Sequence, residues 1–168
     1  ALGDLVFGYG DQELQQVVLQ ELKRQRLRMA TLEIGAASWI GDWMLAADDD
    51  GQQFAGSLAF PHRSSACQWL TDDASEAARD DDAICIALAR EVQKRFDTPL
   101  ALITGAYPSA KEMATAESAF GTFHVLAHGQ EVVVIRKTMG GHPDVLGPRI
   151  AKTSLDIVRR VLADLPVG

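Results

Sequence analysis

Apolar residues recur along this chain with two different spacings, and the alternation between the spacings predicts the order of its elements. In residues 11–25 they fall every three or four positions, as on the buried face of a helix; these residues are Leu14, Val17, Val18 and Leu22. Asp11 precedes them and is a suitable N-cap, because its carboxylate can accept the unpaired N–H groups of a first turn. We therefore expect a helix over residues 11–25.

A strand and a second helix are expected next, joined by a short turn. The run from Leu27 to Ile34 is apolar enough for a buried strand, and Gly35 ends it. Ser38 is a suitable N-cap for the short helix that follows. In α/β proteins such a junction holds ligands and nucleophiles, because a helix N-terminus offers unpaired N–H groups.

The rest of the chain continues the alternation of strands and helices. We expect strands over residues 54–60 and 99–104, helices over 83–96 and 146–165, and a hairpin of strands over 121–127 and 131–138. This order predicts an α/β protein, a three-layer α/β/α sandwich with a mixed sheet. We expect residues 1–10 to be a connecting arm and residues 11–168 to be a single domain.

Composition narrows the range of partners. The formal charge of −7 argues against nonspecific nucleic-acid binding, because a protein that binds in this way needs clustered lysine and arginine side chains. No apolar run approaches the roughly 20 residues of a membrane-spanning helix. The cysteines, Cys67 and Cys85, form no disulfide framework. His124 and His128 are four residues apart, but they fall on an expected strand and turn, and a zinc site needs three or four converging ligands. We expect a cytoplasmic protein that binds no nucleic acid, membrane, metal or cofactor.

Four segments carry a more specific signal: LRMATLE (27–33), FAGSLAF (54–60), LALITGAYP (100–108) and AFGTFHVLA (119–127). In this order they resemble four strands of the CinA C-terminal domain family, whose members include nicotinamide-nucleotide amidases. The family motifs at these strands are Glu-Ser-Cys-Thr-Gly-Gly, Gly-Gly-x-x-x-Tyr, Thr-Gly-x-x-Gly-Pro and Pro-x-Gly-Thr-Val. The opening segment, GDLVFGYGDQELQQVVLQEL (3–22), resembles the arm and first helix that join this domain to an upstream domain in longer members of the family.

The resemblance implies the α/β/α fold and a particular reaction. Members of the family remove the amide nitrogen of nicotinamide mononucleotide and release nicotinic acid mononucleotide and ammonia. The serine of the first motif is understood as the nucleophile, with a lysine and a tyrosine nearby. A hydroxyl attacks an amide only when a base takes its proton, and the oxyanion that forms needs N–H donors.

This chain departs from the family pattern at the positions that carry the chemistry. With Glu33 matched to the motif glutamate, the nucleophile position holds Ile34. The tyrosine position holds Phe60, and the lysine position falls at about Ser65. Because an aliphatic side chain neither accepts nor donates a proton, this match excludes serine catalysis at Ile34.

Other positions keep groups that could contact a ligand. Glu33, Thr104 and Gly105 are retained, and Arg149 could replace a late-loop arginine of the family after a small shift. Glu33 has two interpretations, a cap for the next helix or a contact to a ribose hydroxyl. Ser38 also has two, an N-cap or a displaced nucleophile.

We interpret the chain as a degenerate member that kept the fold and acts by association, as a homo-oligomer or beside an upstream domain in a longer chain. One alternative is an active nicotinamide-nucleotide amidase that uses a relocated residue such as Ser38 or Thr104. Another is a module that binds a pyridine nucleotide without converting it. The tryptophans are expected to fill the former site or to form a self-association surface; they are Trp39, Trp43 and Trp69.

Overall fold

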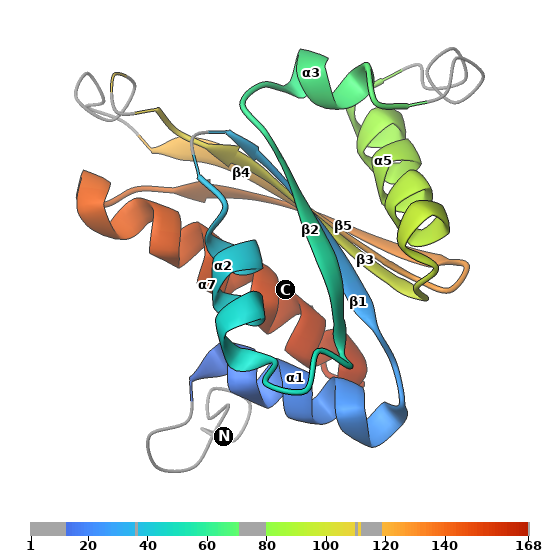
Figure 1. The fold of residues 1–168 in the computed structure, drawn as a ribbon. Helices are drawn as coiled ribbons and strands as arrows, with labels where there is room; N and C mark the ends of the chain where they lie inside the picture. The colour runs from blue at the N-terminus through green and yellow to red at the C-terminus, as the bar shows by residue number, and fades with distance from the viewer. Residues whose placement is uncertain (1–12, 36, 71–79, 110, 112–118, 168) are drawn as a thin grey trace.

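The structure is a computed structural model that describes residues 13–35, 37–70, 80–109, 111 and 119–167 (Figure 1). In chain order the elements are α1 (Leu14–Gln25), β1 (Met29–Gly35), α2 (Trp39–Ala47), β2 (Phe54–Phe60), α3 (Arg63–Cys67), α5 (Asp81–Phe96), β3 (Leu100–Tyr107), β4 (Phe120–His128), β5 (Glu131–Met139) and α7 (Pro143–Leu162). The expected arm and Asp11 lie outside the described residues. Helix α1 has Glu13 as its N-cap, so it begins later than predicted.

The five strands form one mixed sheet in the order β2-β1-β3-β4-β5. Strand β1 lies between β2 and β3 and runs parallel to both. The hairpin of β4 and β5 adds two antiparallel strands beside β3. Helical crossovers produce the parallel part and a tight turn produces the antiparallel part, as the order of elements predicted.

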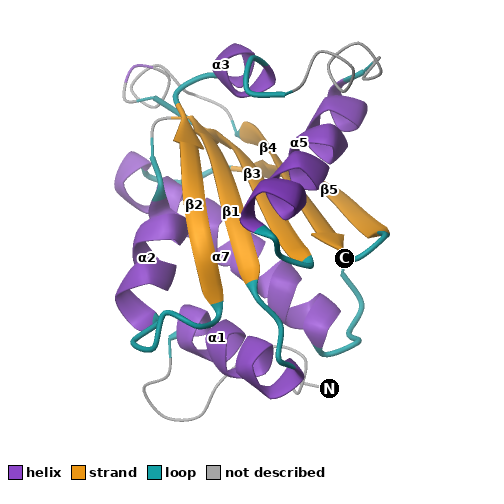
Figure 2. Cartoon of the chain, turned by 45° about the vertical axis from the view of Figure 1, so that its right-hand side comes forward, coloured by secondary structure: helices purple, strands orange, loops and turns teal. Residues whose placement is uncertain are grey.

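Helices cover both faces of the sheet (Figure 2). Helices α2 and α7 pack on one face, and α1 packs against both of them. Helices α3 and α5 pack on the other face. The three-layer α/β/α sandwich is therefore confirmed, and we call its two sides the α7 face and the α5 face.

The central strands are buried on both sides. In β1, Met29 belongs to the apolar core of the α7 face, whereas Leu32 belongs to that of the α5 face. Strand β3 divides in the same way, with Leu102 on the α7 face and Ile103 on the α5 face. Such two-sided burial explains why these strands appear in the sequence as near-continuous apolar runs.

Two element boundaries differ from the prediction. Strand β3 continues to Tyr107 instead of ending at Thr104, because Tyr107 still pairs with Gly35 of β1. Helix α7 begins at Pro143, three residues early, since proline suits a first helical turn, and it ends at Leu162 with Ala163 as its C-cap.

Candidate functional site

The carboxylate of Glu33, near the end of β1, binds the first turn of α2. Glu33 is 0% exposed, although it carries a titratable group. Its Oε2 accepts the backbone N–H of Ile40 at 3.1 Å, and its Oε1 accepts that of Gly41 at 2.9 Å. Two N–H groups that a first helical turn leaves unpaired are thus satisfied, and the structure shows Glu33 as the cap of α2.

Ser38 occupies the N-cap position of α2, as predicted, but its hydroxyl makes no capping bond to the backbone. The Ser38 Oγ instead donates to the Oε1 of Glu33 at 3.3 Å. The carboxylate that ends β1 has therefore taken over the capping role expected of the serine.

The environment of Glu33 disfavours its charged form. Burial is the largest effect and raises the pKa of Glu33, while the N–H groups of Gly41 and Ile40 partly oppose the rise. Tyr107 also favours the carboxylate, although its buried hydroxyl does not reach hydrogen-bond geometry with any of the described residues. Burial and the nearby Glu33 raise the pKa of Tyr107 in turn. The phenol is therefore neutral at pH 7.

The positions at which the chain departs from the family pattern lie together on the α5 face. Ile34 and Phe60 are paired across β1 and β2, so their side chains leave the sheet on the same side. Ile34 is 3% exposed, within the apolar core of this face. Ser65 lies in α3, a helix that packs on the same two strands. The structure thus brings these predicted positions together, and two of the three side chains are apolar.

Trp69 extends this apolar region. Its ring lies 6.2 Å from that of Phe60, and the guanidinium of Arg95 lies 4.1 Å from the Trp69 ring centroid. The rings of Trp39 and Trp43 lie 5.9 Å apart on α2, and these partly buried side chains pack against the core of the α7 face. Trp69 thus lies beside Phe60 on the α5 face, whereas Trp39 and Trp43 lie on the α7 face.

Gly105 lies under an aromatic ring. It pairs with Phe123 across β3 and β4, and a Cβ at Gly105 would lie 2.4 Å from the Cζ of Phe123. The ring can approach the strand this closely only because residue 105 has no side chain. Phe123 therefore covers Gly105 on this side of the sheet.

Thr104 belongs to a buried polar network that the sequence analysis missed. The Oγ of Ser154 lies 2.8 Å from the Oγ1 of Thr104 and 2.7 Å from the Nδ1 of His124. The Oγ1 of Thr122 lies 3.2 Å from the Nε2 of His124. These four residues are between 0% and 2% exposed, so a substrate cannot reach Thr104 in this state of the protein.

The histidine of this network is neutral. Burial lowers the pKa of His124 to about 4, and the positive charge of Lys137 acts in the same direction. A neutral imidazole carries one donor and one acceptor, which suits its position between two hydroxyl groups. The network therefore satisfies buried polar groups between α7 and the sheet.

The four expected ligand contacts do not share one surface. Glu33 and Thr104 are paired and face α2 and α7, whereas Gly105 faces Phe123 on the other side of the sheet. Arg149 is exposed on α7 and donates to the carbonyl of Gly140 in the preceding loop.

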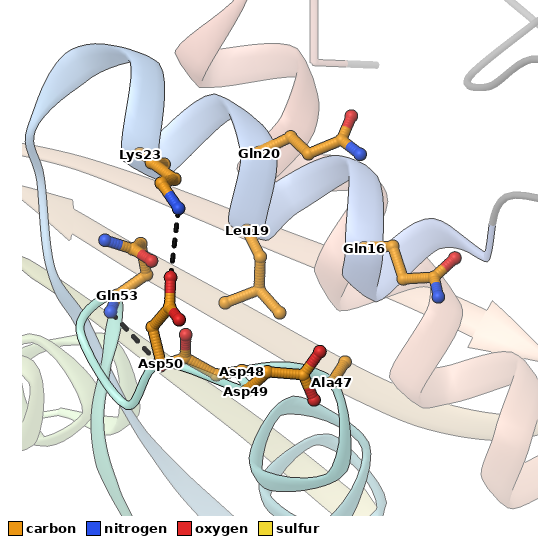
Figure 3. Close-up of a pocket in the computed structure, with 9 residues that line it drawn as sticks. All are labelled: Gln16, Leu19, Gln20, Lys23, Ala47, Asp48, Asp49, Asp50 and Gln53. Carbon is orange, nitrogen blue, oxygen red and sulfur yellow. Dashed lines mark hydrogen bonds and ion pairs between the residues drawn. The ribbon is translucent and has the colours of Figure 1, made fainter.

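A hollow of about 390 Å³ lies between α1 and the turn after α2 (Figure 3). Across this hollow, the Nζ of Lys23 forms an ion pair with the Oδ2 of Asp50 at 3.0 Å. Its lining is largely polar and contains none of the predicted site residues; it is formed by Gln16, Leu19, Gln20, Lys23, Ala47, Asp48, Asp49, Asp50 and Gln53.

The described residues contain neither a metal-binding cluster nor a bilayer-spanning helix. In this part of the chain, no three His, Cys, Asp or Glu side chains gather closely enough to hold a metal ion. None of its helices combines the length and the hydropathy that a bilayer-spanning segment requires.

Known proteins resemble the chain in structure but not measurably in sequence. No protein-family model and no curated protein matches the sequence. A CinA superfamily protein from Klebsiella pneumoniae aligns with a TM-score of 0.67 at 14% identity, over 90% of this chain and 96% of that one. A competence or damage-inducible protein from Enterobacter asburiae aligns with a TM-score of 0.67 at 12% identity, over 92% and 97% of the two chains.

A third solved structure shows the same likeness. The competence/damage inducible protein CihA from Agrobacterium tumefaciens aligns with a TM-score of 0.63 at 9% identity, over 90% of this chain and 92% of that one. At such identities the likeness concerns the fold. The chain has the α/β fold of CinA superfamily structures, which confirms at this level the resemblance found in the sequence.

Proposed function

We propose that this chain is a CinA-like domain that has lost the amidase chemistry of the family it resembles and acts by associating with a second copy. The pairing of Ile34 with Phe60 carries the first part of the proposal. Two neighbouring side chains without any polar atom occupy the places that the resemblance assigns to the nucleophile and to a tyrosine. Hydrolysis of an amide by this route needs an attacking oxygen, and Ile34 has none.

The junction also offers little to a developing negative charge. A helix N-terminus leaves four N–H groups unpaired, and two of those at α2 belong to Ile40 and Gly41. Both are bound by the Glu33 carboxylate, so an oxyanion would have to displace an internal hydrogen bond. A donor that is already satisfied by a buried anion gives no net stabilisation to a transition state.

One observation favours a second candidate, an amidase in which Ser38 is the nucleophile. Ser38 is partly exposed, and its hydroxyl donates to Glu33, a carboxylate whose pKa is raised by burial. A raised pKa makes a carboxylate a better general base at neutral pH. The two N–H groups that bind Glu33 act against this, because they lower its basicity.

Incubation of the purified chain with nicotinamide mononucleotide, with ammonia as the readout, separates the two candidates. The proposal predicts the same background rate for the wild type and for Ser38→Ala. Ammonia release that Ser38→Ala abolishes would support the second candidate and overturn the first. A thermal shift with the same nucleotide detects binding without conversion, because a ligand of the folded state raises its melting temperature.

We also propose a cytoplasmic location. Cys85 is buried and Cys67 is partly buried, and both are free thiols. Burial raises the pKa of Cys85 to about 11, which keeps it protonated and unreactive. Free structural thiols are typical of proteins from a reducing compartment.

A further inference from the structure

Strand β5 forms one edge of the sheet and pairs with β4 along its inner side (Figure 2). In the described part of the chain no strand pairs with its outer side. Every second residue of such an edge directs its N–H and C=O groups outward, where another strand can bind them. The strand spans nine residues, Glu131–Met139, and contains neither glycine nor proline.

The edge is unusually apolar for a surface strand. Four aliphatic residues follow one another, and all are partly exposed; they are Val132, Val133, Val134 and Ile135. The opposite edge, β2, differs, because Gly56 adopts a φ of +143° where the register with β1 shifts. Irregularities of that kind discourage pairing with another chain, and β5 has none among its pairs with β4.

We propose that the β5 strands of two copies of this chain pair in antiparallel fashion about a two-fold axis at Val134, which joins their sheets into one. This inference rests on the proposed function in one respect: it names the surface through which the association occurs. A two-fold axis perpendicular to the sheet keeps each face continuous across the junction, so residues of one face meet residues of the same face.

The charges of β5 select this register. With the axis at Val134, Glu131 of each copy lies opposite the partner's Lys137, and both belong to the α7 face. Between these pairs, Val133 lies opposite the partner's Ile135. A shift of the pairing by two residues would place Glu131 opposite Met139 or Ile135, where its charge has no partner. The strand is therefore self-complementary in one register.

The face beside these residues is incompletely covered by the chain itself. A hollow of about 610 Å³ lies between β5 and the last turns of α1 and α7. Val133 and Glu131 of β5 line it together with Val161 and Leu165. A second strand along β5 would bring the partner's Ile135 and Lys137 to the rim of this hollow and remove part of its apolar lining from water.

On the α5 face the proposed pairing leaves no charged group of β5 without an ion-pair partner. Val132 lies opposite the partner's Arg136 in the proposed register. Arg136 already binds Asp82 of α5 within its own chain. Its apolar stem can cover the valine while its guanidinium keeps that partner.

Sedimentation of the full chain at several concentrations tests the proposal, with four variants. Glu131→Lys creates Lys–Lys pairs across the axis, and Lys137→Glu creates Glu–Glu pairs. Each single variant should raise the dissociation constant of the dimer roughly tenfold, because both Glu131–Lys137 pairs are lost and like charges repel in their place. The double variant E131K/K137E restores opposite charges and should restore the dimer. Asp49→Lys, on an exposed turn after α2, matches the charge change of Glu131→Lys and should leave the dimer unchanged.

Each result is decisive once circular dichroism has shown that the variants are folded. Weakening by both single variants with recovery in the double variant supports the β5 pairing. If the single variants dimerise as tightly as the wild type, or if the double variant stays as weak as the single variants, the β5 pairing is overturned. Association through another surface would then remain possible. A wild type that stays monomeric at all concentrations overturns the inference and the associative part of the proposed function. The amidase assay judges the loss of chemistry separately.

Discussion

Ile34 lies opposite Phe60 on the α5 face of the sheet, whereas its neighbour Glu33 points to the other face and caps α2. Consecutive residues of a strand face opposite sides, so the two positions serve two separate structures. A change at position 34 therefore leaves the cap intact. This separation explains how the chain can keep the CinA-like fold while the position assigned to the nucleophile holds an aliphatic side chain.

Restoring a hydroxyl at the nucleophile position should not restore activity. Ile34→Ser leaves Phe60 and Ser65 unchanged, so the new oxygen has no base to accept its proton. The substitution should lower the free energy of unfolding by about 3 kcal/mol, because it removes buried aliphatic groups. Urea unfolding measures the loss, with Ile34→Val as the mild control. Ammonia release from nicotinamide mononucleotide by Ile34→Ser would contradict this expectation, because it would show that the site lacks only the hydroxyl oxygen.

Glu33→Gln should weaken the junction. An amide offers one acceptor oxygen, so the N–H of Ile40 or of Gly41 loses its partner at a cost of about 1–3 kcal/mol. The folded-state pKa of Glu33 is raised, so its contribution to stability is fully present below its usual value of 4.5 and decreases as pH rises through the raised pKa. The difference in unfolding free energy between the wild type and Glu33→Gln should therefore decrease from pH 4 to pH 8, as measured by urea titrations. A gap that widens would contradict the buried-carboxylate account.

His124 should make the fold sensitive to acid. Its pKa is about 4 in the folded state against 6.5 for the free side chain, so the unfolded state binds more protons between these values. Stability should fall by up to about 3 kcal/mol as pH drops through this window. His124→Gln keeps hydrogen-bonding groups but does not titrate. The difference in unfolding free energy between the two proteins isolates this residue, since other groups, including Glu33 with its opposite slope, cancel.

Gly105→Ala should destabilise the protein because the new methyl group meets the ring of Phe123. Overpacking of this kind costs about 1–3 kcal/mol. Phe123→Leu shortens the opposing side chain, so the double variant should cost less than the sum of the two single variants. Thermal unfolding of all four proteins gives this coupling. Strict additivity would mean that the ring does not rest on Gly105 in solution.

Local patterns predicted the elements well where one strand or helix face decides the structure. Strand β2 spans the predicted residues 54–60, and the boundaries of α2 follow from Ser38 and the turn after Ala47. The two interpretations of Glu33 could also be stated from the sequence, since an acid at a strand–helix junction lies near unpaired N–H groups.

Long-range contacts limited the prediction of the site. Ser154 lies 30 residues from His124 and 50 residues from Thr104 in the sequence, so no local pattern joins them. Thr122 and His124 share one face of a strand by their spacing, and this was the available signal for a buried polar row. The sequence of α7 gave less information, because a single serine among apolar residues does not show which polar groups it contacts.

The central claim is that Ile34 has replaced the attacking oxygen, and chromatographic detection of nicotinic acid mononucleotide tests it most directly. The purified chain is incubated with nicotinamide mononucleotide, beside a sample without protein and one with Ser38→Ala. We predict that all three samples form the acid at the same rate. Sustained formation by the wild type alone, with each molecule completing many cycles, would contradict the account.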